Sequence, residues 1–306
     1  MKELWVEKWR PNTIDNYVFK DENQREQVEY WVKEKSIPHI ILSGAAGTGK
    51  TTLAKALVNE LGIDPYDFLE INASKENSVD TVRERLSNFV STMPFGSFKI
   101  VLMDEADYMS ANGQAAMRNL MESYHENARF ILTCNYPHKI IPALHSRCQG
   151  FHIDSLDKTE FTARTATILL EEGVEFDLDV LDTYVTASYP DLRKCLNLLQ
   201  ANSVSGLLRE PNKSDKATLD YKLAVVDMIK SGKIREARQL LCSQVKTEEM
   251  DDFIRWSYDN LDLWSNTEEG KDQAILIIRN TLVNVSLAAD TEILISAMLV
   301  ELSQIN

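Results

Sequence analysis

The first 150 residues alternate short apolar runs with segments in which apolar residues recur at helical spacing. Apolar runs bounded by turn or polar residues predict buried strands, and they occupy residues 39–44, 67–72, 99–104 and 129–135. Amphipathic segments separate them at residues 50–61, 78–91 and 112–124. Strands that alternate with helices are typical of parallel βαβ units. The pattern therefore predicts an α/β domain with a parallel sheet over residues 1–152.

The strand pattern stops near residue 153, and helical periodicity continues to the C-terminus. Helices are predicted at 157–172, 177–187 and 190–204, with Pro190 in a first turn. We group them as a small helical lid domain, residues 153–208. The polar segment 209–216 indicates a linker. Beyond it, an all-α C-terminal domain, the collar, is expected over residues 209–306, with helices at 217–230, 233–244, 248–263, 268–287 and 290–304.

Composition narrows the class of protein only moderately. The chain is 44% hydrophobic and 26% charged, as in ordinary globular proteins. It has no apolar run long enough to span a membrane and no signal-peptide pattern at its start. Its four cysteines never form CxxC, which argues against a zinc module and for reduced thiols in a cytosol-like compartment. The net charge is −3 over residues 1–150 and −11 over 151–306, so charge neither excludes nor requires a DNA partner.

A phosphate-binding loop is the strongest chemical signal. The segment GAAGTGKT fits GxxxxGK[ST] and lies between a predicted strand and a predicted helix, which is the context that this motif requires. Glycines let backbone N–H groups approach phosphates, and the helix N-terminus favours their negative charge. Lys50 can reach the β- and γ-phosphates, and the Thr51 hydroxyl can ligate Mg²⁺. ATP and Mg²⁺ are the expected cofactors, and the predicted binding residues here are Gly44, Ala45, Ala46, Gly47, Thr48, Gly49, Lys50, Thr51 and Thr52.

Two carboxylates end the apolar run at residues 100–103. Asp104 suits Mg²⁺ binding, and Glu105 suits polarisation of an attacking water. Adjacent carboxylates at a strand end are often merely solvated, but their position about fifty residues after a phosphate-binding loop predicts ATP hydrolysis. Residues 104–107 also spell DEAD, the signature of a helicase family. That family's second core domain and usual loop sequence are not found in this sequence.

Three further polar residues are candidates for the same site. Asn135 ends the fourth predicted strand, where an amide can orient a water or a phosphate oxygen, or can simply end the strand. Arg147 follows a short helical stretch at the end of the α/β domain; it is either a solvated cation or a finger that reaches a neighbouring subunit's γ-phosphate. Arg193 opens a lid helix, from which it could fold onto the phosphates in cis.

Together these segments resemble an AAA+ ATPase and, more narrowly, a sliding-clamp-loader small subunit of the replication factor C type. The similar segments are EKWRP at 7–11, EINAS at 70–74 with Val82-Arg83, DEAD at 104–107, Met121-Glu122, Cys134-Asn135, Ser146-Arg147-Cys148 and PDLR at 190–193. They run from residue 5 to about residue 200. The compact chain is also similar to the large ATPase subunit of T4-type phage clamp loaders. The family usually has two prolines where this chain has Ala45 and Ala46.

The resemblance implies a role for each matching position. Trp9, Arg10, Pro11 and Val18 would lie near the adenine. Asn135 would act as sensor 1 and Arg193 as sensor 2, with Arg147 acting in trans, and Asn72 would restrain Glu105 until DNA arrives. Ser78, Thr81 and Arg83 would follow template phosphates, although Arg83 fits a solvated helix face equally well. Met93, Phe95 and Phe98 would contact the clamp, unless they belong to the core.

The function that the resemblance implies is clamp loading. ATP binding would open a ring-shaped clamp and grip primer–template DNA, and hydrolysis would release both. Expected partners are other loader subunits in a ring-like, pentameric assembly, the sliding clamp and primer–template DNA, with no membrane. The expected compartment is the cytoplasm or nucleoid, the host cytoplasm for a phage protein, or the nucleus for a eukaryotic one. Alternatives are another AAA+ DNA motor, such as a branch-migration helicase or an initiator, and a small-molecule P-loop kinase. A helicase would call for a C-terminal winged helix, and a kinase for an acceptor site.

Overall fold

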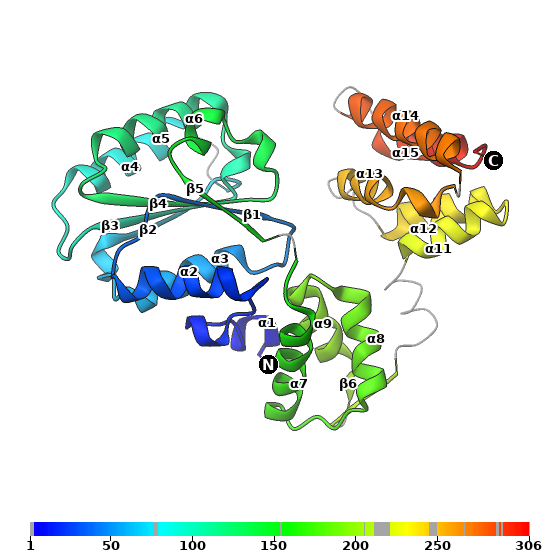
Figure 1. Ribbon diagram of the computed structural model, residues 1–306, viewed down its shortest axis with the longest axis horizontal. Helices are drawn as coiled ribbons and strands as arrows, with labels where there is room; N and C mark the ends of the chain where they lie inside the picture. Colours follow the sequence, from blue (N-terminus) through cyan, green and yellow to red (C-terminus); the bar gives the residue numbers. More distant parts are fainter. Residues whose placement is uncertain are drawn as a thin grey trace. The chain divides into compact units, whose positions relative to one another are not determined.

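The computed structural model of the chain forms two compact units, residues 1–210 and 211–306 (Figure 1). The residues that it describes are 3–75, 79–153, 155–204, 206–210, 221–244, 250–265, 267–285, 288 and 290–305. Each unit has its own apolar core.

The first unit is built on a five-stranded sheet. Its strands are β1 (Ile40–Gly44), β2 (Phe68–Asn72), β3 (Lys99–Asp104), β4 (Ala128–Cys134) and β5 (Gln149–Ile153). The order is β2-β3-β4-β1-β5, and every neighbouring pair is parallel. The first four strands lie within one residue of the predicted bounds, whereas β5 was not predicted. Ligands of open parallel sheets bind beyond the carboxyl ends of the strands. The residues that follow β1, β3 and β4 are therefore the first candidates for a ligand-binding site.

Helices cover both faces of this sheet (Figure 1). One face carries α2 (Glu22–Lys33) and α3 (Lys50–Glu60), and the other carries α4 (Val79–Ser91), α5 (Ala111–Ser123) and α6 (Pro142–His145). β3 and β4 supply fully buried side chains to the cores on both faces, because parallel strands between two helical layers have no solvent side. Short helices complete the connections: α1 (Trp5–Lys8), η1 (Ile14–Asn16), η2 (Pro65–Asp67), η3 (Ala106–Tyr108) and η4 (Pro137–Lys139).

Three helices complete the first unit: α7 (Lys158–Glu171), α8 (Leu178–Ser188) and α9 (Leu192–Asn202). α9 begins two residues later than predicted, because the Asp191 carboxylate caps it by accepting the backbone N–H of Lys194 at 2.9 Å. Pro190 therefore precedes the helix and does not lie in its first turn. A small antiparallel hairpin of β6 (Ser203–Val204) and β7 (Leu207–Leu208) follows, a second departure from the predicted helical pattern.

The second unit is helical throughout its described residues. It contains α11 (Tyr221–Lys230), α12 (Ile234–Gln244), α13 (Met250–Asp259), η6 (Leu261–Leu263), α14 (Glu268–Val285) and α15 (Thr291–Leu302). Val225, Phe253 and Leu299 are completely buried in its core. The predicted fold class, an α/β core followed by helical parts, is thus confirmed, whereas the three domain boundaries stay predictions. Among the helices described, none is both long and apolar enough to cross a membrane.

Candidate functional site

The phosphate-binding loop connects β1 to α3 in a conformation that depends on glycine. Gly47 and Gly49 have φ angles of +77° and +88°, which side-chain-bearing residues rarely adopt. Gly49 immediately precedes α3, so the positive end of the helix dipole faces the loop. The buried Lys50 ammonium donates to the carbonyl oxygens of Gly44 (2.9 Å) and Ala45 (2.6 Å). The loop therefore offers backbone N–H groups and one cation to an anionic ligand.

A hydroxyl–carboxylate network lies beside this loop. The Thr51 and Thr133 hydroxyls both donate to Asp104 Oδ1, at 2.6 and 2.7 Å. Because each hydroxyl proton points at Asp104, the Thr51 oxygen keeps lone pairs for a cation. Hydroxyl and carboxylate oxygens are the ligands that Mg²⁺ prefers, with phosphate oxygens and waters completing its six positions. The donor set thus fits the predicted metal-binding pair, Thr51 and Asp104.

A polar pocket joins the predicted catalytic residues to the loop. Glu105 and Asn135 line it together with Lys50, Asp104 and Arg193. Parallel strands bring Glu105 and Asn135 together, since one follows β3 and the other follows β4. Arg193 reaches the pocket from the first turn of α9. The pocket can thus hold a triphosphate between two cations, next to a carboxylate that can polarise water.

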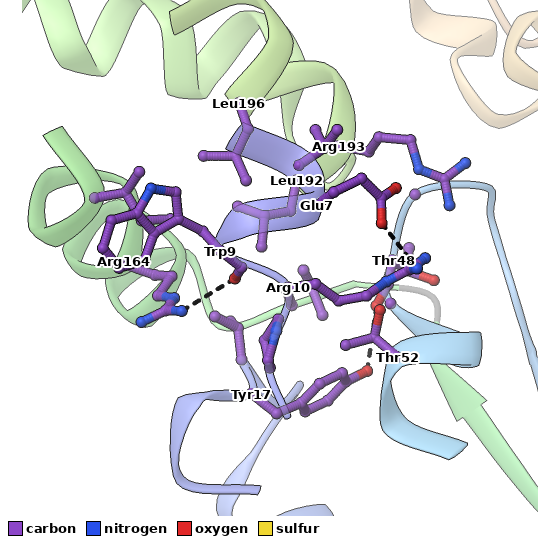
Figure 2. Close-up of a pocket in the computed structure, with 17 residues that line it drawn as sticks. Glu7, Trp9, Arg10, Tyr17, Thr48, Thr52, Arg164, Leu192, Arg193 and Leu196 are labelled. Atoms are coloured by element: carbon purple, nitrogen blue, oxygen red, sulfur yellow. Dashed lines mark hydrogen bonds and ion pairs between the residues drawn. The ribbon is translucent and has the colours of Figure 1, made fainter. Parts of the chain in front are cut away.

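A second, more apolar pocket adjoins the loop (Figure 2). Its wall comes from the N-terminal segment and from α7 and α9, and its lining includes the predicted residues Trp9, Arg10, Pro11, Val18 and Thr52. Arg164 fixes this wall by donating to the Trp9 carbonyl oxygen at 3.2 Å, and Arg10 pairs with Glu7 at 3.2 Å (Figure 2). Apolar walls with few polar groups suit a planar base.

Several contacts in these pockets were not predicted from the sequence. The buried Tyr17 hydroxyl donates to the Thr48 carbonyl oxygen at 3.2 Å, and its ring lies against Gly49. The Asp191 carboxylate packs so closely on Gly47 that a Cβ there would lie 1.9 Å from Asp191 Oδ1. No sequence motif indicates these contacts, since each joins segments that are distant along the chain.

Asn72 ends β2 beside Asp104, the carboxylate predicted to bind the metal. Its amide nitrogen lies 3.5 Å from Asp104 Oδ2, and its amide oxygen accepts two hydrogen bonds from Ser74. The structure thus places the Asn72 side chain against Asp104, whereas the prediction assigned Glu105 as its partner. The sequence order could not distinguish these adjacent carboxylates.

Arg147 lies apart from both pockets, just after α6. Its guanidinium donates to the Ala143 carbonyl oxygen at 2.9 Å and forms an ion pair with Glu122 of α5. Both side chains remain partly exposed, at 35% and 44%. The arginine therefore belongs to the surface of this unit and does not contact this chain's own phosphate-binding loop.

The remaining predicted residues lie on the surface or outside the described part of the chain. Arg83 is exposed on α4; Thr81 is in the same helix, but its side chain and the whole of Ser78 fall outside the described residues. Met93 and Phe95 are 80% and 78% exposed. Phe98 is only 6% exposed and lies under the Arg129 guanidinium, which favours the core over a docking surface for this residue.

Comparisons with known proteins agree with this geometry. The profile of the ATPase family associated with various cellular activities (AAA) matches residues 40–156. The replication factor C small subunit of Saccharolobus solfataricus is 37% identical over 98% of this chain and 94% of that protein. The corresponding subunit of Sulfurisphaera tokodaii is 42% identical, over 76% of this chain and 69% of that protein.

A solved structure has a similar fold at low sequence identity. The Thermotoga maritima RuvB Holliday junction branch migration motor superposes with a TM-score of 0.60 and 13% identity, covering 81% of this chain and 91% of that chain. This likeness shows the shared AAA+ fold alone. The sequence relatives carry the assignment: the chain belongs to the family of replication factor C small subunits and is an ATP-hydrolysing enzyme of the AAA class.

Proposed function

We propose that the chain is an ATPase subunit of a sliding-clamp loader. ATP binding drives clamp opening and the binding of primer–template DNA, and hydrolysis then releases the closed clamp on the DNA. The observation that carries the proposal is one pocket that joins the phosphate-binding loop to Thr51, Asp104 and Glu105, in a family named for a replication factor. Within the described residues the second unit is helical, which favours a subunit-binding collar over the winged helix of a branch-migration motor.

The chemistry of hydrolysis is assigned to residues of the polar pocket. Mg²⁺, held by Thr51 and Asp104 together with the phosphates, would neutralise charge on the transferred phosphoryl group. Glu105 polarises the attacking water, and Asn135 orients that water or a γ-phosphate oxygen. Lys50 and Arg193 stabilise the negative charge of the phosphates. Asn72 influences the position of the Asp104 carboxylate through its side-chain amide.

Arg147 is proposed to act on the nucleotide of an adjacent subunit in a ring-like, pentameric assembly. This follows from its position outside the pockets of its own chain. An arginine finger raises the hydrolysis rate by about 10³–10⁵-fold. Arg147→Ala should therefore abolish stimulated hydrolysis while nucleotide affinity stays near wild type. Arg147→Lys, which keeps the charge but not the planar fork, serves as the matched variant. Loss of nucleotide binding in Arg147→Ala would contradict a role in trans.

DNA contact is proposed for the N-terminal part of α4, around Arg83. Removing one phosphate contact reduces the slope of the logarithm of the binding constant against the logarithm of the salt concentration by about one. Arg83→Ala should accordingly weaken DNA stimulation with a shallower salt slope, whereas Arg85→Ala, an exposed neighbour on the same helix, should change it less. If the salt slope of Arg83→Ala is unchanged, Arg83 does not contact DNA and is a solvated residue of the helix face.

The clamp is proposed to contact the exposed side chains of Met93 and Phe95. Tyr66 is 77% exposed and its ring lies 5.8 Å from that of Phe95, so these two rings form one exposed apolar surface. The decisive experiment for the whole function measures ATP hydrolysis with and without primed DNA and the cognate clamp. Stimulation is expected. A rate that stays at its basal level with both partners present would refute clamp loading.

A further inference from the structure

Thr133 is a buried residue of β4 that contacts both carboxylate-bearing residues at the end of β3. The register that pairs Met103 with Leu132 puts Asp104 beside Thr133, which is only 2% exposed. Its hydroxyl donates to Asp104 Oδ1 at 2.7 Å and accepts the backbone N–H of Glu105 at 2.9 Å. One hydroxyl group therefore holds the metal-binding carboxylate and the backbone of the proposed general base.

The backbone of Glu105 has a disfavoured conformation that requires a stabilising contact such as the hydrogen bond to Thr133. Its φ and ψ angles are 57° and 44°, the left-handed conformation that side-chain-bearing residues disfavour. A disfavoured conformation persists only where surrounding contacts fix it. The Glu105 carbonyl oxygen accepts the N–H of Tyr108, and its own N–H is bound by Thr133. The direction in which the Glu105 side chain enters the polar pocket therefore depends on the Thr133 hydroxyl.

The ends of β3 and β4 are joined by a second set of hydrogen bonds, in which a side chain that follows β3 binds the backbone that follows β4. Asp107, which follows β3, accepts the backbone N–H groups of Asn135 (3.2 Å) and Tyr136 (3.1 Å), which follow β4. Asp107 is 7% exposed, so these bonds are shielded from water. Thr133 and Asp107 thus form a cross-strand brace that fixes Glu105 relative to Asn135.

We infer that Thr133 is a positioning residue for ATP hydrolysis. It sets the geometry of Glu105 and Asp104 through its hydroxyl, without itself acting on the substrate. The inference rests on the proposed catalytic role of Glu105. A threonine hydroxyl can donate once and accept once here, and a serine hydroxyl has the same capacity. Valine matches threonine in shape but can do neither.

The test compares Thr133→Val, Thr133→Ser and wild type in the full-length chain assembled with its partner subunits. Single-turnover hydrolysis and ATP affinity are measured separately, so that binding and chemistry can be distinguished. Thr133→Val should lower the hydrolysis rate by about 10- to 100-fold, as a misplaced catalytic group does, with ATP affinity near wild type. Thr133→Ser should recover most of the rate.

Thr165→Val is the matched control. Thr165 is also fully buried, and its hydroxyl bonds the Thr162 carbonyl oxygen within α7. It should keep the wild-type hydrolysis rate, and thermal unfolding of both valine variants shows any loss of folded protein. A wild-type rate in Thr133→Val, or an equal loss of rate and ATP affinity, would overturn the inference.

A second comparison separates this inference from the proposed function. Glu105→Gln should abolish most hydrolysis, and adding Thr133→Val to it should lower the residual rate by a smaller factor than it lowers the wild-type rate, because the part of its effect that acts through Glu105 is already lost. If Glu105→Gln hydrolyses ATP normally, the catalytic assignment itself is wrong. If Glu105→Gln is inactive and Thr133→Val is not, only the role of Thr133 fails.

Discussion

ATP affinity should fall at alkaline pH because of one buried lysine. The Lys50 side chain is 8% exposed, and burial lowers its pKa from 10.5 to about 8, with the Arg193 cation acting in the same direction. Carboxylates such as Asp104 oppose this shift only in part. Without nucleotide, Lys50 therefore loses its proton over a range centred near pH 8, where about half of the molecules are deprotonated.

The magnitude follows from proton linkage. A bound triphosphate places negative charge beside the ammonium and raises its pKa, so binding above pH 8 takes up a proton. The Kd should be nearly constant below pH 7.5 and rise about tenfold per pH unit above pH 8, reaching about 30-fold at pH 9.5. At pH 8.5, binding should take up about 0.8 proton.

Folding stability should change in the opposite direction over the same range. Because the folded-state pKa of Lys50 lies below its unfolded value of 10.5, the unfolded chain binds more protons between about pH 8 and 10.5. This residue's contribution therefore makes the folded state more stable as pH rises through that window. Deprotonation of Lys50 therefore does not unfold the chain at pH 9.5, and the weaker ATP binding expected there has to come from the lost ammonium charge.

The assay is calorimetric titration with a slowly hydrolysed ATP analogue and Mg²⁺ between pH 7 and 9.5. Repeating each titration in buffers of different ionisation enthalpy counts the protons taken up. Lys50→Arg is the control, since its guanidinium stays charged throughout, and its Kd should not vary with pH even if it is weaker at pH 7. A wild-type Kd that stays flat to pH 9.5, or an equal slope in Lys50→Arg, would refute the reasoning.

Three further changes test other parts of the structure. Gly47→Ala combines a φ of +77° with a Cβ only 1.9 Å from Asp191 Oδ1, so ATP affinity measured by titration should fall about tenfold or more. Asp67→Ala removes the acceptor of the Phe95 and Gly96 N–H groups and should lower the free energy of unfolding in urea by about 2 kcal/mol. Leu299→Ala should destabilise the second unit by about 2–5 kcal/mol, seen as a lower thermal midpoint, with ATP affinity unchanged.

The central strands and the edge strand β2 were predictable from their apolar runs, whereas the edge strand β5 and helix α2 were not. β1, β3 and β4 read as continuous apolar runs because both of their faces are buried. β5 lies at the edge of the sheet and buries only Phe151 and Ile153, so its alternating pattern is short. α2 was missed for a similar reason, since only Val28 and Trp31 of its twelve residues are buried. Its Asp21 N-cap was the available signal.

In the candidate site, too, some residues could be predicted from the sequence and others could not. Motif spacing identified Lys50, Asp104 and Glu105, because each lies at or after the end of a strand in the order that nucleotide binding requires. Contacts made by Thr133 and Asp191 depend on which segments become neighbours in the folded chain, and sequence spacing does not contain that information. The sequence thus specified which chemical groups are present more fully than it specified what holds them in place.

The Glu122–Arg147 ion pair shows that a resting contact need not prevent a role in trans. An exposed pair of this kind contributes about 0–1 kcal/mol, because water and salt screen both charges. A finger that raises the rate by about 10³–10⁵-fold supplies about 4–7 kcal/mol to the transition state. In the proposed role, the contact of Arg147 with an adjacent subunit's γ-phosphate in the transition state would therefore outweigh the loss of its pair with Glu122. Until a neighbour is bound, the pair keeps the guanidinium at the surface of its own subunit.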